Sequence, residues 1–168
     1  MRFDGQVALI TGAGSGIGRA TSAIIAMEGG TVVGVDINQV GLDSVSDQLQ
    51  GVSGVCATVC KRLAQADISA VVEGCMARFG HIDILVNAVG GSTVIANPGT
   101  LVEELSLDDW RALVDFNLTG TFLCCNAVVP IMKQQRSGKI VNLASVLDGG
   151  SARSAAVPTP RPRGASSR

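Results

Sequence analysis

Apolar residues follow two patterns along the chain. Short runs in which almost every residue is apolar are typical of buried strands, whereas longer segments with an apolar residue every three or four positions are typical of helices. The predicted strands are residues 6–11, 31–36, 52–59, 82–87 and 139–143. The predicted helices are residues 16–28, 40–49, 68–79, 106–117 and about 118–135.

Strands and helices alternate in this prediction, and the strands are apolar over nearly their whole length. Such strands are buried on both faces, which favours a parallel sheet with helices on each side. Right-handed crossovers make this a doubly wound, Rossmann-type α/β fold with five strands. Ser106, with Asp109 three residues later, predicts a capped helix start. Pro130 is expected to kink the last helix.

A glycine-rich turn, TGAGSGIG at residues 11–18, joins the first strand to the first helix. Glycines allow a sharp turn and close approach of the backbone, and a helix N-terminus attracts phosphate. The candidate cofactor-binding residues here are Gly12, Ser15, Gly16, Ile17 and Gly18. Because the spacing differs from the Gly-x-Gly-x-x-Gly fingerprint, the motif alone fits a purely structural turn equally well.

Asp36 ends the second strand about 20 residues after this turn, where a carboxylate can bind an adenosine ribose. It could also cap the following helix, and the two roles are compatible. A carboxylate repels a 2′-phosphate, and neither Ser15 nor the Ile37-Asn38 pair supplies a positive charge. The sequence therefore predicts NAD as the cofactor in preference to NADP.

The composition indicates a globular protein. Of 168 residues, 46% are hydrophobic and 16% are charged, and this size suits one domain. Five cysteines without metal-ligand spacing are expected to be reduced, small core residues, and no metal site is predicted. We find neither a secretory signal nor an apolar run near the roughly 20 residues of a membrane span, so we expect a cytoplasmic protein without a membrane partner.

The net charge of −1 is unevenly distributed. All 14 acidic residues lie at or before Asp148, whereas four of the 13 basic residues follow it. The acidic part argues against a nucleic-acid partner. We expect a dinucleotide-binding domain over residues 1–150 and a disordered tail rich in Pro, Arg and Ser over residues 151–168.

Four motifs, in order, resemble those of the short-chain dehydrogenase/reductase family. They are TGAGSGIG at 11–18, NAVG at 87–90, DFNLTG at 115–120 and GKIVNLAS at 138–145. The resemblance runs from about residue 3 to Ser145. It implies hydride transfer between a nicotinamide and an alcohol or ketone, by enzymes that are usually homo-oligomers.

The resemblance also assigns roles to individual residues. Ser145 would polarise the substrate carbonyl, and Asn117 would hold a water molecule that relays protons. Besides the glycine turn and Asp36, the cofactor contacts would be Asn87, Ala88, Gly90 and Asp67. Each has a plainer alternative: Asn87 could satisfy backbone groups, Asn117 could be a polar helix residue, and Ser145 could be a cap.

Four further residues have less specific expectations. Asn142 and Ser92 are candidates to line the cleft. His81 is expected in a surface loop, and Trp110 in helix packing.

Two departures from the family pattern concern the cofactor. Ala88 replaces an asparagine of the family's Asn-Asn-Ala-Gly motif. Asp67 has the residue type that the family uses to hold the adenine, but it stands close to Phe79, and the spacing would put that acid near Lys61. The adenine contact is therefore left open between Asp67 and none.

A third departure concerns catalysis. The family uses a tyrosine as general acid or base, with its pKa lowered by a lysine four residues later. This chain has no tyrosine, and its last lysine is Lys139. We hypothesise that the tail is a frameshifted reading of a family member, because codons for residues 158–167 allow Tyr-x-x-x-Lys in the shifted frame.

Three functional readings follow for the chain as written. In the first, it is an oxidoreductase by family that lacks its acid/base pair and is inactive. In the second, it is a cofactor-binding remnant. In the third and least favoured, it is an interaction module with a basic tail. Loss of the elements that follow the fifth strand would uncover the apolar face of residues 118–132 and favour aggregation.

Overall fold

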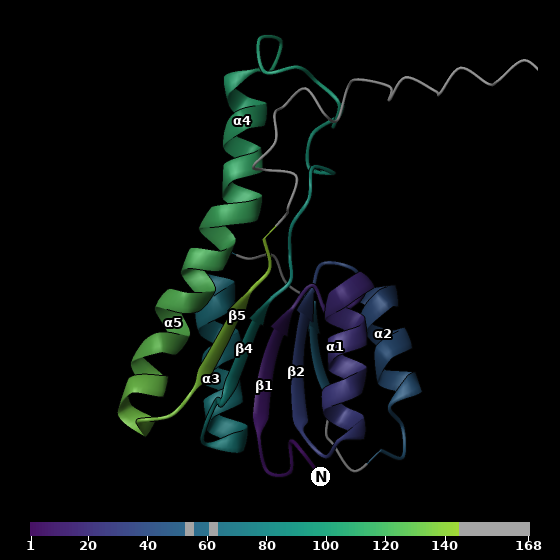
Figure 1. Ribbon diagram of the computed structural model, residues 1–168, viewed down its shortest axis with the longest axis vertical. Coiled ribbons are helices and arrows are strands. Elements are labelled where there is room, and N and C mark those ends of the chain that lie inside the picture. Colours follow the sequence, from purple (N-terminus) through teal and green to yellow (C-terminus); the bar gives the residue numbers. More distant parts are fainter. Residues whose placement is uncertain (53–55, 61–63, 145–168) are drawn as a thin grey trace, which may run out of the picture.

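The computed structural model describes residues 1–52, 56–60 and 64–144 (Figure 1). The five strands are β1 (Val7–Thr11), β2 (Thr31–Asp36), β3 (Cys56–Cys60), β4 (Ile84–Asn87) and β5 (Lys139–Asn142). The helices are α1 (Gly16–Met27), α2 (Gln39–Gln48), α3 (Gln65–Phe79), α4 (Leu107–Val114), the π-helical η1 (Asp115–Thr119) and α5 (Gly120–Gln135).

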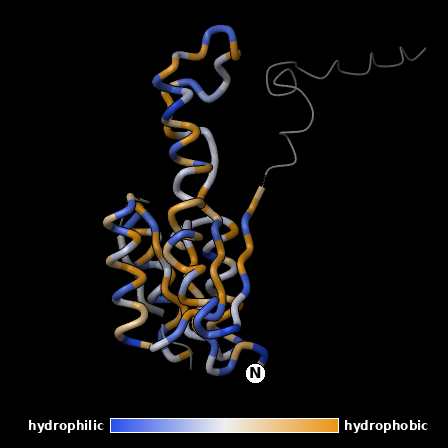
Figure 2. The backbone as a smooth tube through the Cα atoms, turned by 90° about the vertical axis from the view of Figure 1, so that its left-hand side faces the viewer, coloured by the Kyte–Doolittle hydropathy of each residue, from blue (hydrophilic) through white to orange (hydrophobic). Residues whose placement is uncertain are grey.

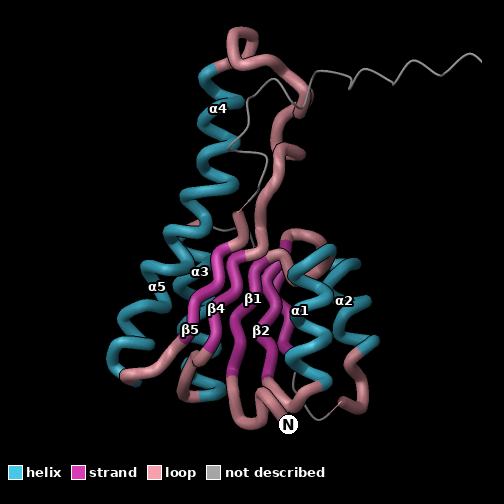
Figure 3. The backbone as a smooth tube through the Cα atoms, in the orientation of Figure 1, coloured by secondary structure: helices cyan, strands magenta, loops and turns pink. Residues whose placement is uncertain are grey.

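The strands form one sheet in the order β3-β2-β1-β4-β5, and every neighbouring pair is parallel (Figure 3). The chain moves outward from β1 to β3 and then returns to the other side of β1 with β4. This reversal of direction makes the crevice between β1 and β4 the switch point, where open α/β sheets bind ligands. The predicted doubly wound fold is confirmed.

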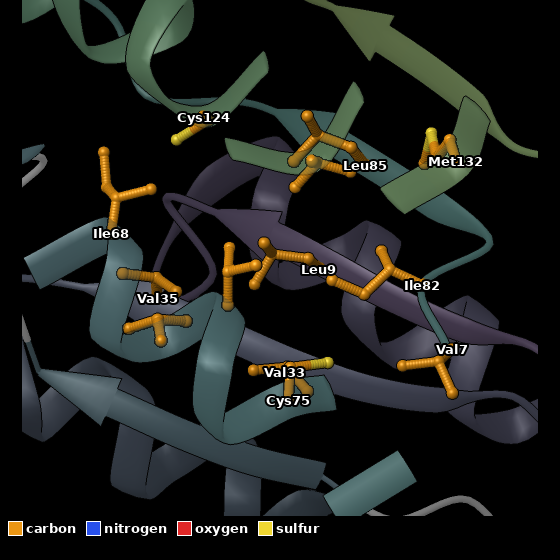
Figure 4. Close-up of a cluster of buried hydrophobic side chains, with 13 residues drawn as sticks. Val7, Leu9, Val33, Val35, Ile68, Cys75, Ile82, Leu85, Cys124 and Met132 are labelled. Atoms are coloured by element: carbon orange, nitrogen blue, oxygen red, sulfur yellow. The ribbon is translucent and has the colours of Figure 1, made fainter. Parts of the chain in front are cut away.

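Helices cover both faces of the sheet. Alternate residues of one strand point to opposite faces: Leu9 belongs to a core cluster with α3 and α5, whereas Ala8 and Ile10 belong to a cluster with α1 and α2. Figure 4 shows the first cluster, in which Leu85 of β4 and Cys124 of α5 lie with Leu9. Figure 2 shows long hydrophobic stretches in the body of the molecule and further hydrophobic positions, alternating with hydrophilic ones, along the helical run above it.

Most predicted boundaries agree with the structure to within a few residues. The third strand begins only at Cys56, and residues 53–55 lie outside the described part. Helix α3 begins at Gln65, three residues earlier than predicted. Val40 begins the apolar pattern of the helix predicted over residues 40–49 but is 79% exposed, whereas Leu42 and Val45 are buried.

The two helices predicted around residue 117 form one helical run. α4 passes through η1 into α5 without a break, and α5 continues through Pro130 to Gln135. Ser106 is the N-cap of α4, and its hydroxyl accepts a hydrogen bond from Asp109 N at 3.0 Å, as predicted. The run extends beyond the carboxyl edge of the sheet (Figure 1).

This helical run carries exposed apolar residues. Trp110, which was expected in helix packing, is 53% exposed, and all four residues of β5 are exposed. Within the described residues, Leu107–Gln135 is the one helical stretch long and apolar enough to cross a membrane by length and composition, with 17% of its most apolar window buried. The sequence expectation missed this stretch. Because α5 packs on α3 and β4, these properties also suit a helix that covers a sheet.

Candidate active site at the carboxyl edge of the sheet

The candidate cofactor residues gather where the parallel strands end. Thr11 pairs with Asn87 in the β1–β4 register, and Asn87 pairs with Asn142 in the β4–β5 register. Asp36 ends β2 on the other side of β1. The segments that follow these strand ends are the glycine turn, the start of α2 and the loop after β4, and they surround the switch point.

The glycine turn has the backbone geometry that its sequence predicts. Gly12 and Gly16 have φ angles of +70° and +49°, a region that residues with a Cβ rarely adopt. A Cβ on Gly12 would lie 3.1 Å from the Ala88 carbonyl oxygen, and one on Gly18 would clash with the Gly12 carbonyl. The turn therefore lies at backbone contact distance from the first turn of α1 and from the end of β4.

The N-terminus of α1 points its first backbone N–H groups into this region. Ser15 is the N-cap, but its side chain makes no capping hydrogen bond. Ser15, Gly16 and Ile17 are exposed, and the first turn of α1 contains no acidic residue. Because the first N–H groups of a helix lack partners within the helix, such an end can receive a phosphate.

Asp36 is half-buried, and backbone donors hold both of its carboxylate oxygens. Oδ2 accepts from Gly14 N at 2.9 Å, and Oδ1 accepts from Asn38 N at 2.9 Å. The cap of α2 is Asn38, whose Oδ1 accepts from Gly41 N at 3.1 Å. The alternative in which Asp36 caps α2 is therefore wrong, because Asn38 occupies the cap position.

Two side-chain hydrogen bonds tie neighbouring strand ends together. The Thr11 hydroxyl, which is buried, accepts from Ala88 N at 3.2 Å. Asn87 Nδ2 donates to Asn142 Oδ1 at 2.8 Å, and the same nitrogen donates to Cys125 Sγ at 3.5 Å. Among the described residues, Asn87 Oδ1 has no hydrogen-bond partner. Thr11 begins the predicted turn motif but was not among the candidate contact residues, although a hydroxyl at the end of an apolar strand is the signal that could have identified it.

Asn117 lies inside η1 and holds the loop after β4. Its Oδ1 accepts from Gly91 N at 2.8 Å, and its Nδ2 donates to Gly91 O and to Leu113 O, both at 2.9 Å. Its backbone carbonyl accepts from the Thr121 hydroxyl at 3.1 Å. Two of the three amide hydrogen bonds thus hold the loop at Gly91, and the third holds the side chain to Leu113 of α4.

The other predicted residues are placed as follows. Gly90 is exposed and close to Asn117, and Ser92 is half-buried in the same loop. Asp67 lies half-buried in the first turn of α3 rather than directly at a strand end. His81, on the loop before β4, is at the opposite edge, 3.1 Å from Gly5 O. Ser145 and Lys61 lie outside the described residues.

Burial changes the acidity of two thiols near the sheet. Desolvation raises the pKa of Cys75 in α3 to about 11. Desolvation, with a smaller contribution from Cys125, raises the pKa of Cys124 in α5 to about 12.

Within the described part of the chain, no group of three or more His, Cys, Asp and Glu residues could hold a metal ion.

A family profile described as short chain dehydrogenase matches residues 6–156. The chain belongs to this family. Two curated relatives are each 41% identical to it: a 3-oxoacyl-acyl-carrier-protein reductase from Thermotoga maritima, over 88% of this chain and 58% of the relative, and a D-threitol dehydrogenase from Mycolicibacterium smegmatis, over 86% and 54%. This short-chain dehydrogenase chain thus spans little more than half the length of these relatives.

Solved structures of short-chain dehydrogenases have the same fold. A metagenomic short-chain oxidoreductase in complex with NADP is 29% identical, with a TM-score of 0.79 over 86% of this chain and 64% of its own. An NAD⁺-bound xylitol dehydrogenase is also 29% identical, with a TM-score of 0.80 over 89% and 56%. Both cofactors therefore occur among similar proteins.

Proposed function

We propose that this short-chain dehydrogenase chain binds NAD in preference to NADP at the carboxyl edge of its sheet. Asp36 carries the proposal. Its carboxylate ends β2, and its 2.9 Å contact with Gly14 N fixes it against the glycine turn. A ribose hydroxyl can donate to a carboxylate, whereas a 2′-phosphate at this place would be repelled. Similar structures hold either cofactor, so the choice rests on the residues of this chain.

The residues present suit a dinucleotide. A Cβ on Gly12 or Gly18 would meet backbone atoms of Ala88 or Gly12, so glycine at both positions lets the turn close tightly and present the N-terminus of α1 to a pyrophosphate. The exposed N-terminus of α1 would hold the phosphates, and Asp36 would bind the ribose. The segment from Asn87 to Gly90 would line the crevice near the nicotinamide. Asp67, in the first turn of α3, stays a candidate for the adenine.

We further propose that the parent enzyme interconverts an alcohol and a ketone. The cofactor would supply the hydride acceptor. Among the residues of this chain, Ser145 would polarise the carbonyl, and Asn117 would hold the active-site loop through Gly91. The two curated relatives are equally similar to this chain in sequence but are named for different substrates. We therefore propose only the substrate class, an alcohol or a ketone.

The chain as given is proposed to bind cofactor without turnover. It contains no tyrosine, and no lysine follows Lys139, so the acid/base pair of the family is missing. General acid/base catalysis contributes roughly 10²–10⁴-fold to rates. The second candidate function is therefore a cofactor-binding remnant without catalysis.

Titration calorimetry with NAD and with NADP tests the proposal. We expect the unmodified chain to bind NAD more tightly, by about 1–3 kcal/mol, the usual cost of an unpaired or repelled buried polar contact. Asp36→Ala should narrow this difference. Asp43→Ala, which removes a charge from α2 outside the site, is the matched control and should preserve the preference. Tighter binding of NADP by the unmodified chain would refute the assignment.

A further inference from the structure

The first turn of α2 packs against the back of the glycine turn. Gly41, the third residue of α2, is buried. A Cβ on Gly41 would lie 2.5 Å from the Gly14 carbonyl oxygen and 3.0 Å from the Gly14 carbonyl carbon. Real Cβ atoms do not approach a backbone so closely, so only a glycine allows this contact. Gly41 is outside the sequence motif that identifies the turn.

A closed set of contacts links Gly41 to the carboxylate of Asp36. Gly41 N donates to Asn38 Oδ1 at 3.1 Å, and Asn38 N donates to Asp36 Oδ1 at 2.9 Å. The other carboxylate oxygen accepts from Gly14 N at 2.9 Å, and Gly14 in turn touches Gly41. The position of α2 therefore determines whether the Gly14–Asp36 hydrogen bond keeps its length.

We propose that Gly41 is a positioning residue for the choice between NAD and NADP, an inference that rests on the cofactor binding proposed above. A side chain at position 41 must move either α2 or the glycine turn. Either movement lengthens the Gly14–Asp36 hydrogen bond and frees one carboxylate oxygen. A carboxylate that can turn away binds a ribose hydroxyl less well and excludes a 2′-phosphate less strictly.

Gly41→Ala tests this proposal, with Gly74→Ala as the matched control. Gly74 also lies inside a helix, α3, but a Cβ there would meet nothing within 4 Å. Dissociation constants for NAD and NADP are measured by titration calorimetry, and urea unfolding confirms that each variant is folded. For Gly41→Ala we expect NAD binding to weaken at least about fivefold and NADP binding to change less than about twofold, whereas Gly74→Ala should change neither.

The ratio of the two dissociation constants separates positioning from a general structural role. A parallel loss for both cofactors, or an unchanged ratio, would overturn the proposal. If Gly41→Ala does not fold, Gly14→Ala provides the test instead. Its Cβ would lie 3.1 Å from Asp36 Oδ2, so this variant should likewise bring the NAD and NADP dissociation constants closer together. If the unmodified chain binds neither cofactor, the proposed function fails and this inference fails with it; if the unmodified chain prefers NAD and the variants keep that preference, only this inference fails.

Discussion

Alkaline pH should destabilise the protein through the buried thiol of Cys75. This side chain is 3% exposed in the cluster between α3 and the sheet, and burial raises its pKa from 9.0 to about 11. In the unfolded chain the thiol loses its proton near pH 9, whereas in the folded protein it keeps the proton until about pH 11. The stabilising contribution is therefore complete below pH 9 and is lost as the pH rises toward 11.

The size of this effect follows from proton linkage. Over the interval in which only the unfolded chain is deprotonated, the free energy of unfolding falls by about 1.4 kcal/mol per pH unit for one group. Between about pH 8 and about pH 10.5, Cys75 should therefore account for a loss of about 2 kcal/mol. Cys124, whose pKa is raised to about 12, should add a similar loss.

Urea unfolding under reducing conditions at these two pH values measures the effect. In Cys75→Ala the alkaline loss of stability should be smaller than in the unmodified protein by about 2 kcal/mol. Val72→Ala, on the same buried face of α3, is the matched control: it should lower stability at both pH values and keep the full alkaline loss. Equal alkaline losses in Cys75→Ala and the unmodified protein would show that this thiol is not protected by burial.

Ser106→Ala should lower the free energy of unfolding by about 1 kcal/mol in urea, because it removes the cap of α4, and no change would mean that the cap is dispensable. Asn117→Leu should lose three hydrogen bonds, destabilise the protein by about 1–3 kcal/mol and raise the hydrogen-exchange rate of Gly91 N–H; unchanged exchange would contradict the positioning role. A gene shifted in frame at codon 158 and continued to its stop codon should show NADH formation with secondary alcohols, roughly 10²–10⁴-fold above the given chain, and equal rates would refute the catalytic reading.

The sheet could be predicted because its signals are local. Each strand is an apolar run between turn residues, and the order of strands and helices restricts the fold to the doubly wound class. The glycine turn could be predicted for the same reason. The positive φ angle and the close backbone contacts at Gly12 require a glycine, and the sequence has one there. The position of Asp36 at a strand end followed from the same pattern.

The contacts across the site were not predictable in this way. The π-helical η1 shifts the position of Asn117 relative to a regular α-helix, and no residue type in the sequence predicts a π-helical segment. The bonds from Asn87 to Asn142 and from Thr11 to Ala88 depend on strand register, which only the folded sheet defines. The exposure of Val40 and Trp110 was not predictable either, because an apolar residue on an amphipathic pattern need not face the core.

Cofactor binding and catalysis should therefore be separable in this chain. Three contacts, Gly14 to Asp36, Ala88 to Thr11 and Asn87 to Asn142, join segments at the carboxyl edge through the protein's own groups. A site that is already ordered loses less conformational freedom when a dinucleotide binds, which favours binding even where proton transfer is missing. The proton transfer itself needs a group that titrates beside the substrate, and neither Asn117 nor Ser145 can exchange a proton near neutral pH. We therefore expect a calorimetric binding signal without hydride transfer, and the same chain should give both results.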